Sequence, residues 1–372
     1  MKASLAKNLQ FSAFKFGALE LKSACRVGII SAGFFTLLGC AGDDTVKQSI
    51  EDYTERLSRV LDVSLPDTFN EKITTPLPKL ADSATLKYTI EGVSINLREF
   101  YALQDCELGT VVAERNTSLG KSQLPSQRLT YESKLLTALK HCETALSEDS
   151  SANQANAALA ATIASWREQK LQDYSKTWAN LIQGSQELRL ALNTPERLMS
   201  VENNKDALSS VNALYYLDNL NNKNERPIDS SELELQLQII RSARLPATLW
   251  HTQQTLTQNL SLLTSVLATE LDAVSCPEGR ASDKAKILRN VFYLFFIEQI
   301  QPVGSLVNQY HYKLAPLWED WLAQPLLHKE FKRYIRQQTQ DGFSEYSGAM
   351  KAHVNLWQNF LGRCNLSPVA PV

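Results

Sequence analysis

Residues 245–276 read LPATLWHTQQTLTQNLSLLTSVLATELDAVSC, and this stretch decides the fold class. Its leucines recur three or four residues apart, which places them on one face of an α-helix. The pair Leu245-Pro246 is typical of a helix start, because proline is accepted in the first turn, and Cys276-Pro277 is typical of an end. We predict one long helix with the following core-facing stripe: Leu249, Leu256, Leu260, Leu263, Leu267, Leu271 and Val274.

Helical periodicity continues on both sides of this stretch. Residues 46–61 carry apolar side chains at alternating spacings of four and three, which predicts an amphipathic helix. Residues 291–300 are apolar on most faces, which predicts a central core helix. Thr194-Pro195 resembles another helix start. Glycine and proline number only 14 and 13 in 372 residues and fall at breaks in the pattern. We therefore predict an all-α protein, built as a multi-helix bundle or helical array, with two helical subdomains as one option.

Composition divides the chain into four predicted parts. Residues 1–39 form a signal peptide, and residues 40–146 form an N-terminal helical subdomain that contains a helix hairpin. The polar segment SEDSSANQAN at 147–156 is the predicted linker. Residues 157–372 form the C-terminal helical bundle.

The N-terminal segment resembles the export signal of a bacterial lipoprotein. Basic residues precede a 12-residue apolar run at 27–38, which is too short to span a bilayer as a helix. The run ends in Leu37-Leu38-Gly39-Cys40, the order of a lipobox, so we expect a diacylglycerol on Cys40. Ordinary secretion or a retained anchor is the alternative. Ala41 follows the cysteine, and the absence of aspartate there favours sorting to the outer membrane, on its periplasmic face.

Four further cysteines follow in the body of the chain: Cys106, Cys142, Cys276 and Cys364. In an oxidising compartment an even number of cysteines indicates two disulfides, and four cysteines allow three pairings. We favour Cys106–Cys142 and Cys276–Cys364, because each pair can join neighbouring helices. Buried free thiols are the alternative.

The most distinctive cluster of residues lies at a predicted helix corner. A helix from about residue 97 to 116 is followed by a loop through Gly120, and a second helix, capped by Ser126, continues to about residue 141. In the structural interpretation, Glu114, Arg128 and Glu132 form a polar network that holds the corner. In the functional interpretation the corner is a binding surface made of the following residues: Glu114, Arg115, Asn116, Lys121, Gln127 and Arg128.

This corner also carries a family resemblance. The segments Cys106-Glu107-Leu108, residues 112–120 and residues 125–132 resemble motifs of an uncharacterised family of Gram-negative lipoproteins that contain a domain of unknown function. A cysteine near the C-terminus, here Cys364, is similar as well. The resemblance spans nearly the whole mature chain and implies no activity.

Signatures of catalysis are weak. Gly120-Lys121-Ser122 lacks the preceding glycine of a phosphate-binding loop, and Ser118-x-x-Lys121 has none of the motifs that accompany this spacing in penicillin-interacting enzymes. The five histidines show no His-Glu-x-x-His spacing, so we expect no metal or other cofactor. His311, between Tyr310 and Tyr312, is predicted to be packed or exposed rather than catalytic.

Charge and compartment narrow the expected partners. The formal net charge is −2, and removal of the basic signal makes the body more acidic, which argues against nucleic acid. We expect a lipid-anchored envelope protein that binds or scaffolds another envelope component without catalysis. The alternatives are a hydrolase of envelope polymers with a site assembled from distant residues, and a carrier whose cavity is lined by residues 292–300.

Overall fold

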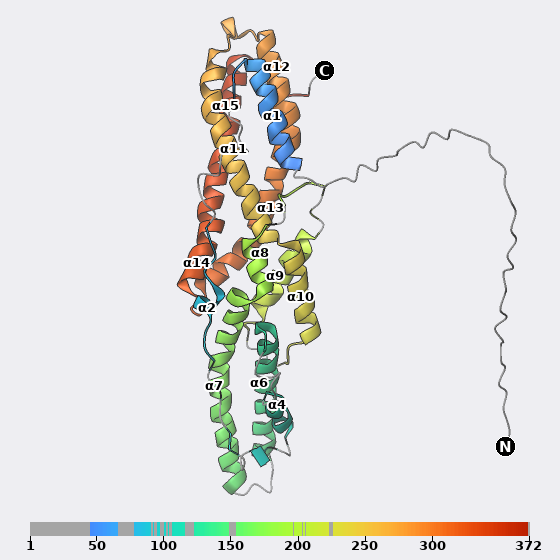
Figure 1. The fold of residues 1–372 in the computed structure, drawn as a ribbon, viewed down its shortest axis with the longest axis vertical. Coiled ribbons are helices and arrows are strands. Elements are labelled where there is room, and N and C mark those ends of the chain that lie inside the picture. Colours follow the sequence, from blue (N-terminus) through green and yellow to red (C-terminus); the bar gives the residue numbers. More distant parts are fainter. Residues whose placement is uncertain are drawn as a thin grey trace, which may run out of the picture. The chain divides into compact units, whose positions relative to one another are not determined.

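The computed structural model describes residues 45–65, 78–90, 92, 95–96, 100–101, 103, 106–115, 123–148, 154–195, 197–202, 204, 206–222 and 226–370 (Figure 1). Among these residues all regular structure is helical and no β-strand occurs, which confirms the all-α prediction. Residues Gly42–Val372 form one compact unit. The helices are α1 (Thr45–Leu61), α2 (Ser83–Leu86), α4 (Glu107–Arg115), α6 (Pro125–Glu148), α7 (Gln154–Gly184), α8 (Gln186–Asn193), α9 (Ala207–Asn219), α10 (Ser230–Ala243), α11 (Leu245–Ala273), η1 (Pro277–Gly279), α12 (Asp283–Val291), η2 (Phe292–Ile300), α13 (Gln301–Ala323), α14 (Lys329–Arg336), η3 (Gln337–Asp341) and α15 (Gly342–Arg363).

The predicted long helix is α11, which begins at Leu245 as expected and lies in the main hydrophobic core. Its leucine stripe is buried, and Leu260, Leu263 and Leu267 have no exposed surface. Helix α15 packs along α11, and Figure 1 shows the two side by side. Full burial of a leucine side chain contributes roughly 1.5–3 kcal/mol, so this stripe is a principal source of stability.

The apolar segment at 291–300 belongs to one continuous helical run rather than to a separate α-helix. Helix α12 passes directly into η2, a π-helix, and η2 passes into α13. Pro302 lies in the first turn of α13, where its missing N–H is tolerated. Phe292 and Phe296 are buried, but Leu294 is 38% exposed. The segment belongs to the main hydrophobic core through Phe292, Phe296 and Ile300, and it leaves its opposite side exposed.

Helices α13 and α15 approach closely at a glycine. The Tyr346 hydroxyl donates to the Gly304 carbonyl oxygen at 2.9 Å. A Cβ atom on Gly304 would lie 2.9 Å from both Tyr346 Oη and Met350 Cε, so no larger residue fits without movement. In contrast, a Cβ atom on Gly348 of α15 would meet no atom within 4 Å.

A buried histidine joins three elements of the main core. His353 of α15 has no exposed surface, and its Nδ1 lies 2.9 Å from Thr264 Oγ1 on α11. Because the Thr264 hydroxyl donates to the Leu260 carbonyl, we assign the imidazole proton to Nδ1. The other nitrogen, Nε2, then accepts from Tyr53 Oη of α1 at 3.0 Å and from Trp357 Nε1 at 3.2 Å. Burial lowers the pKa of His353 to about 3.

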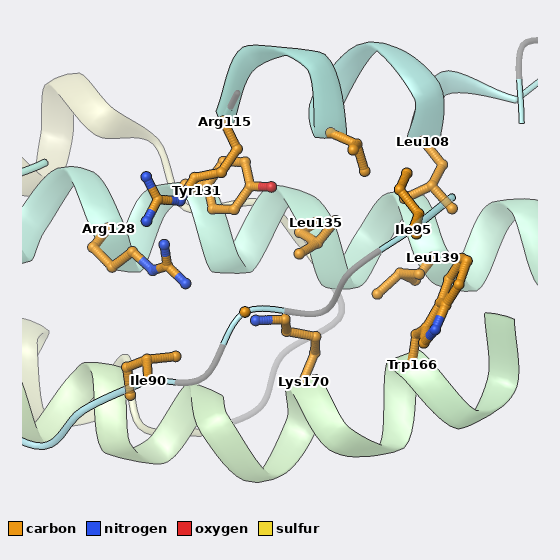
Figure 2. Close-up of a pocket in the computed structure, with 12 residues that line it drawn as sticks. Ile90, Ile95, Leu108, Arg115, Arg128, Tyr131, Leu135, Leu139, Trp166 and Lys170 are labelled. Carbon is orange, nitrogen blue, oxygen red and sulfur yellow. The ribbon is translucent and has the colours of Figure 1, made fainter. Parts of the chain in front are cut away.

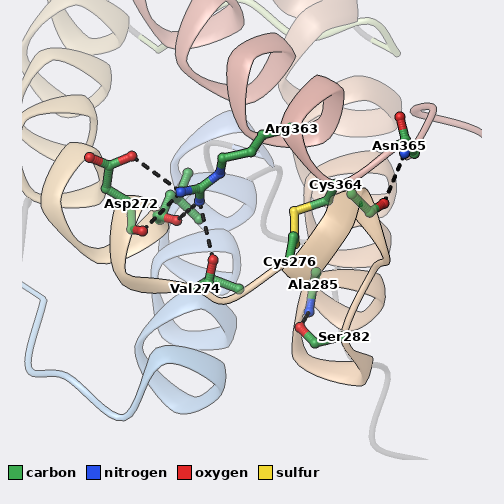
Figure 3. The surroundings of a disulfide bond; sticks show 10 residues. Asp272, Val274, Cys276, Ser282, Ala285, Arg363, Cys364 and Asn365 are labelled. Carbon is green, nitrogen blue, oxygen red and sulfur yellow. Dashed lines mark hydrogen bonds and ion pairs between the residues drawn. A yellow bond between two sulfur atoms is a disulfide. The ribbon is translucent and has the colours of Figure 1, made fainter.

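The C-terminal end of α11 is fixed by the end of α15 (Figure 3). A disulfide joins Cys276 to Cys364, as predicted. Beside it, Arg363 donates to backbone carbonyls at the end of α11: those of Leu271, Asp272 and Val274. The Leu271 carbonyl also accepts from the Val274 backbone N–H at 3.2 Å, and the arginine adds donors at a helix end, where carbonyls otherwise lack partners.

A second, smaller core lies between α4, α6 and α7. The disulfide Cys106–Cys142, also predicted, joins the start of α4 to α6. Ile163 of α7 belongs to this core, so the core draws residues from both sides of the segment 147–156. The segment connects two helices that pack side by side, and the division into subdomains there remains a prediction.

Three local predictions differ from the structure. The chain turns at Leu103 before α4 begins, so the predicted helix over 97–116 is interrupted. Helix α6 begins at Pro125, and the side chain of Gln127, not that of Ser126, bonds the backbone at its start. Pro195 lies after the end of α8 and begins no helix.

Candidate binding site between α4, α6 and α7

Three helices each present a cationic residue at one end of a shared cavity and apolar residues toward the other end. On α4 the order is Leu108, Val112 and Arg115, at helical spacings of four and three. Helix α6 supplies Arg128 near its start and Leu135 and Leu139 further along. Helix α7 supplies Trp166 and Lys170, four residues apart. Figure 2 shows the two arginines grouped near Tyr131 and away from Leu139 and Trp166.

The chain direction explains this arrangement. Arg115 ends α4 and Arg128 lies in the first turns of α6, so the two arginines meet where the chain reverses direction. The disulfide Cys106–Cys142 joins the two helices at the other end of α4. The cavity is therefore framed by a covalent link at its apolar end and by charged groups at its opposite end.

The cavity volume is about 180 Å³. This volume exceeds the roughly 150 Å³ of an engineered apolar cavity that binds benzene. A second, more open cavity of about 460 Å³ adjoins it and shares Ile90, Arg115 and Arg128 as lining residues. The two arginines therefore lie at the junction between a smaller cavity with a mixed polar and apolar lining and a larger one that Lys87 and Asn180 also line.

A buried ionic network forms the floor of the charged end. Glu132 of α6 has no exposed surface and forms an ion pair with Arg128. Lys170 Nζ lies 3.5 Å from the Glu132 carboxylate and 4.0 Å from Asp173 Oδ2. Lys170 and Asp173 are each 4% exposed. Buried charges of this kind require partners, because an uncompensated charge in a low-dielectric interior is costly.

The two arginines each leave a guanidinium nitrogen without a partner. Arg115 Nη1 and Arg128 Nε are buried and have no hydrogen-bond partner among the residues that the structure describes. Burial, and then repulsion by Arg128, lower the pKa of Arg115. For Tyr131, burial and the Glu132 carboxylate raise the pKa of the phenol to about 12, so it remains a neutral hydrogen-bond donor. The charged end of the cavity thus offers donors that are suited to an anion.

The structure separates the residues of the predicted corner surface. Arg115 and Arg128 line the cavity, and Glu114 is exposed. Gln127 is exposed and accepts a hydrogen bond from the Leu124 backbone N–H at 3.1 Å, which gives it a structural role. Asn116 and Lys121 lie outside the described residues. The predicted pairing of Arg128 with Glu132 is present.

Sequence reasoning missed the contribution of α7. The sequence-based binding surface did not include Trp166 and Lys170, although their spacing of four places them on one helix face. Tyr131 belongs to the motif at residues 125–132, but the motif alone does not place it in a cavity. Ile90 lies 38 residues before Arg128, and no local pattern in the sequence indicates that the two share a cavity.

The other candidate groups lie in packed surroundings. The ring of His311 stacks on Phe343 with 3.4 Å between ring centroids, and burial lowers its pKa to about 4. Trp318 and Trp321 are buried in the main core. In the described part of the chain, no group of three His, Cys, Asp or Glu side chains could hold a metal ion. Among the same residues, no helix is both long and apolar enough to cross a bilayer.

Comparison with known proteins identifies a family. No curated protein and no solved structure matches the chain. One family model, described as a protein of unknown function (DUF3080), matches residues 50–368. The matched range includes α4, α6, α7 and all four disulfide cysteines. The chain therefore belongs to the DUF3080 family of proteins of unknown function.

Proposed function

We propose that this protein is a non-catalytic binding or scaffolding protein of the cell envelope, held by a lipid on Cys40. The observation that carries the binding role is the cavity between α4, α6 and α7, where Arg115 and Arg128 converge over a buried ionic floor. The lipobox at residues 37–40 supports the anchor, and Ala41 supports the periplasmic face of the outer membrane as its location. The protein then has two partners: the membrane, through its lipid anchor, and an envelope component bound at the corner.

A carrier of an apolar ligand is the second candidate. Leu135, Leu139 and Trp166 give the cavity an apolar wall, which favours this role. The residues first considered for such a cavity, 292–300, pack differently: Phe292 stacks on Trp357 at 4.6 Å between ring centroids. The candidate carrier site therefore lies between α4, α6 and α7 instead.

The anchor is tested by metabolic labelling with an alkyne-tagged fatty acid, followed by membrane fractionation. We expect the wild-type chain to incorporate the label and to sediment with outer membranes. The Cys40→Ser variant is expected to lose both properties. Equal labelling of the two chains would refute lipidation at Cys40.

The binding role is tested by photo-crosslinking in cells from a photoreactive amino acid at Gln127, which is exposed at the corner. Asn222, exposed in the turn after α9, is the control position. We expect a discrete product from position 127 that position 222 does not give. The same products from both positions, or none from either, would contradict an envelope partner at the corner.

A further inference from the structure

The cavity between α4, α6 and α7 has a polarity that indicates the class of its ligand. Its cations, one from each of the three helices, lie toward one end, and Leu139 and Trp166 lie toward the other (Figure 2). A ligand that satisfies both ends must itself carry charge at one end and apolar surface at the other. A free inorganic anion would leave the wall of Leu139 and Trp166 in contact with water, and a hydrocarbon would leave Arg115 without a partner.

The sign of the charge follows from the groups at the polar end. Arg115, Arg128 and Lys170 converge there and face two buried carboxylates, Glu132 and Asp173. Arg128 and Lys170 share Glu132, but Arg115 Nη1 and Arg128 Nε are buried and have no hydrogen-bond partner in the described structure. A guanidinium binds carboxylate and phosphate groups in bidentate geometry. The ligand group that suits this end of the cavity is therefore negatively charged.

The dimensions limit the apolar part. From Tyr131 to Leu139 the axis of α6 rises about 12 Å, since each helical residue adds about 1.5 Å. The smaller cavity, at about 180 Å³, has room for a chain of medium length or a single ring but not for a long lipid. The wider cavity beyond Arg115 and Arg128 leaves space for a hydrated head group.

We propose that this cavity binds a medium-chain amphiphilic anion, with its carboxylate or phosphate against Arg115 and Arg128 and its apolar chain against Leu139 and Trp166. The inference rests on the proposed binding role and names the ligand class for the same site. Carboxylate and phosphate heads share the chemistry that two arginines recognise, and the experiment below distinguishes them.

The test uses the full chain in membranes of expressing cells and a decanoic acid that carries a diazirine and an alkyne. After irradiation, the label is quantified on the isolated chain and mapped by mass spectrometry. We expect labelled residues on α4, α6 or α7. Unlabelled decanoate and decyl phosphate should compete, and whichever competes at the lower concentration identifies the head group. Decanol and inorganic phosphate should compete at least 10-fold less effectively.

Two variants test the two ends of the cavity. Arg115→Gln removes the positive charge at the polar end. It should raise the probe concentration for half-maximal labelling by roughly 10- to 100-fold, because that is the effect of losing one hydrogen bond to a charged group. Val112→Trp fills the apolar end and should abolish labelling. The matched control is Arg241→Gln, at an exposed arginine in the last turn of α10, which should label as the wild type does. Resistance of each variant to proteolysis checks that it has folded.

Four results would overturn the inference: no labelling of the wild type, labels only outside these helices, equal competition by decanol or by inorganic phosphate, or no effect of Arg115→Gln in a folded variant. These outcomes can be distinguished from failure of the binding role itself. If crosslinking from position 127 captures a protein but the fatty-acid probe gives no label, the proposed function stands and the amphiphilic ligand is ruled out.

Discussion

The buried imidazole of His353 should make the free energy of unfolding depend on pH. In the folded chain its pKa is about 3, because burial disfavours the charged ring. In the unfolded chain the ordinary value is about 6.5. Between these two values the unfolded state binds a proton that the folded state does not, so the free energy of unfolding falls as the pH falls. The contribution is fully present above about pH 6.5 and is lost progressively toward pH 3.

The size of this effect follows from the two pKa values. One unit of difference corresponds to about 1.4 kcal/mol, so the whole window represents about 5 kcal/mol. Between pH 7 and pH 4.5 the expected loss is about 2.5 kcal/mol. The structural cause is that protonated Nε2 can no longer accept from Tyr53 Oη and Trp357 Nε1, which lie at 3.0 and 3.2 Å.

The assay is urea unfolding of residues 42–372, followed by circular dichroism, at pH 7 and at pH 4.5. The matched variant is His353→Gln, which keeps a polar side chain but cannot titrate. Other groups, including His311, are present in both chains and cancel in the difference. We expect the variant to be less stable at pH 7 and the gap to shrink by about 2.5 kcal/mol at pH 4.5. If the difference in free energy of unfolding between the two chains were the same at both pH values, His353 would not be the source of the acid dependence.

Three further perturbations test the packing. Joint replacement of Cys276 and Cys364 by alanine should lower the free energy of unfolding by about 4–5 kcal/mol, because the bond closes a loop with a sequence separation of 88; a loss below about 1 kcal/mol in urea unfolding would contradict this. Gly304→Ala should cost about 1–3 kcal/mol by overpacking, and Gly348→Ala should be neutral or slightly stabilising; equal melting temperatures would count against the close approach of α13 and α15. Glu132→Gln should cost about 3–5 kcal/mol, because it leaves buried cations uncompensated, and wild-type stability of this variant in urea would show that the network is solvated.

The helical elements were predictable where a long apolar stripe dominates. Helix α11 has six stripe positions in phase, and Val274 follows as its C-terminal cap, so periodicity alone places the helix in the core. The π-helical geometry of η2 was not predictable, because the spacing of apolar residues changes only slightly between α- and π-helices. Pro195 did not indicate a helix start, because proline is equally compatible with a helix start and with the segment that follows a helix.

The disulfides and the proximity of two arginines at the corner were also predictable. Cys106 and Cys142 lie on the two sides of a recognisable hairpin, so chain reversal brings them together. Arg115 and Arg128 flank the same reversal. The place of Lys170 in the cavity could not be predicted, because it depends on how α7 packs on α6, and no local sequence pattern specifies that packing.

The partnership of α11 with α15 has a consequence for the order in which this chain can fold. During synthesis α1 and α11 emerge with their apolar stripes complete, but much of their cover comes later, from helices within residues 283–363. The cysteine that closes the end of α11 is Cys364, so this disulfide cannot form until residue 364 has been made. Contacts between distant parts of a chain form slowly and leave apolar surface exposed in the meantime. The apolar face of α11 should therefore stay open to aggregation until α15 has been made, and truncation within α15 should leave that face uncovered.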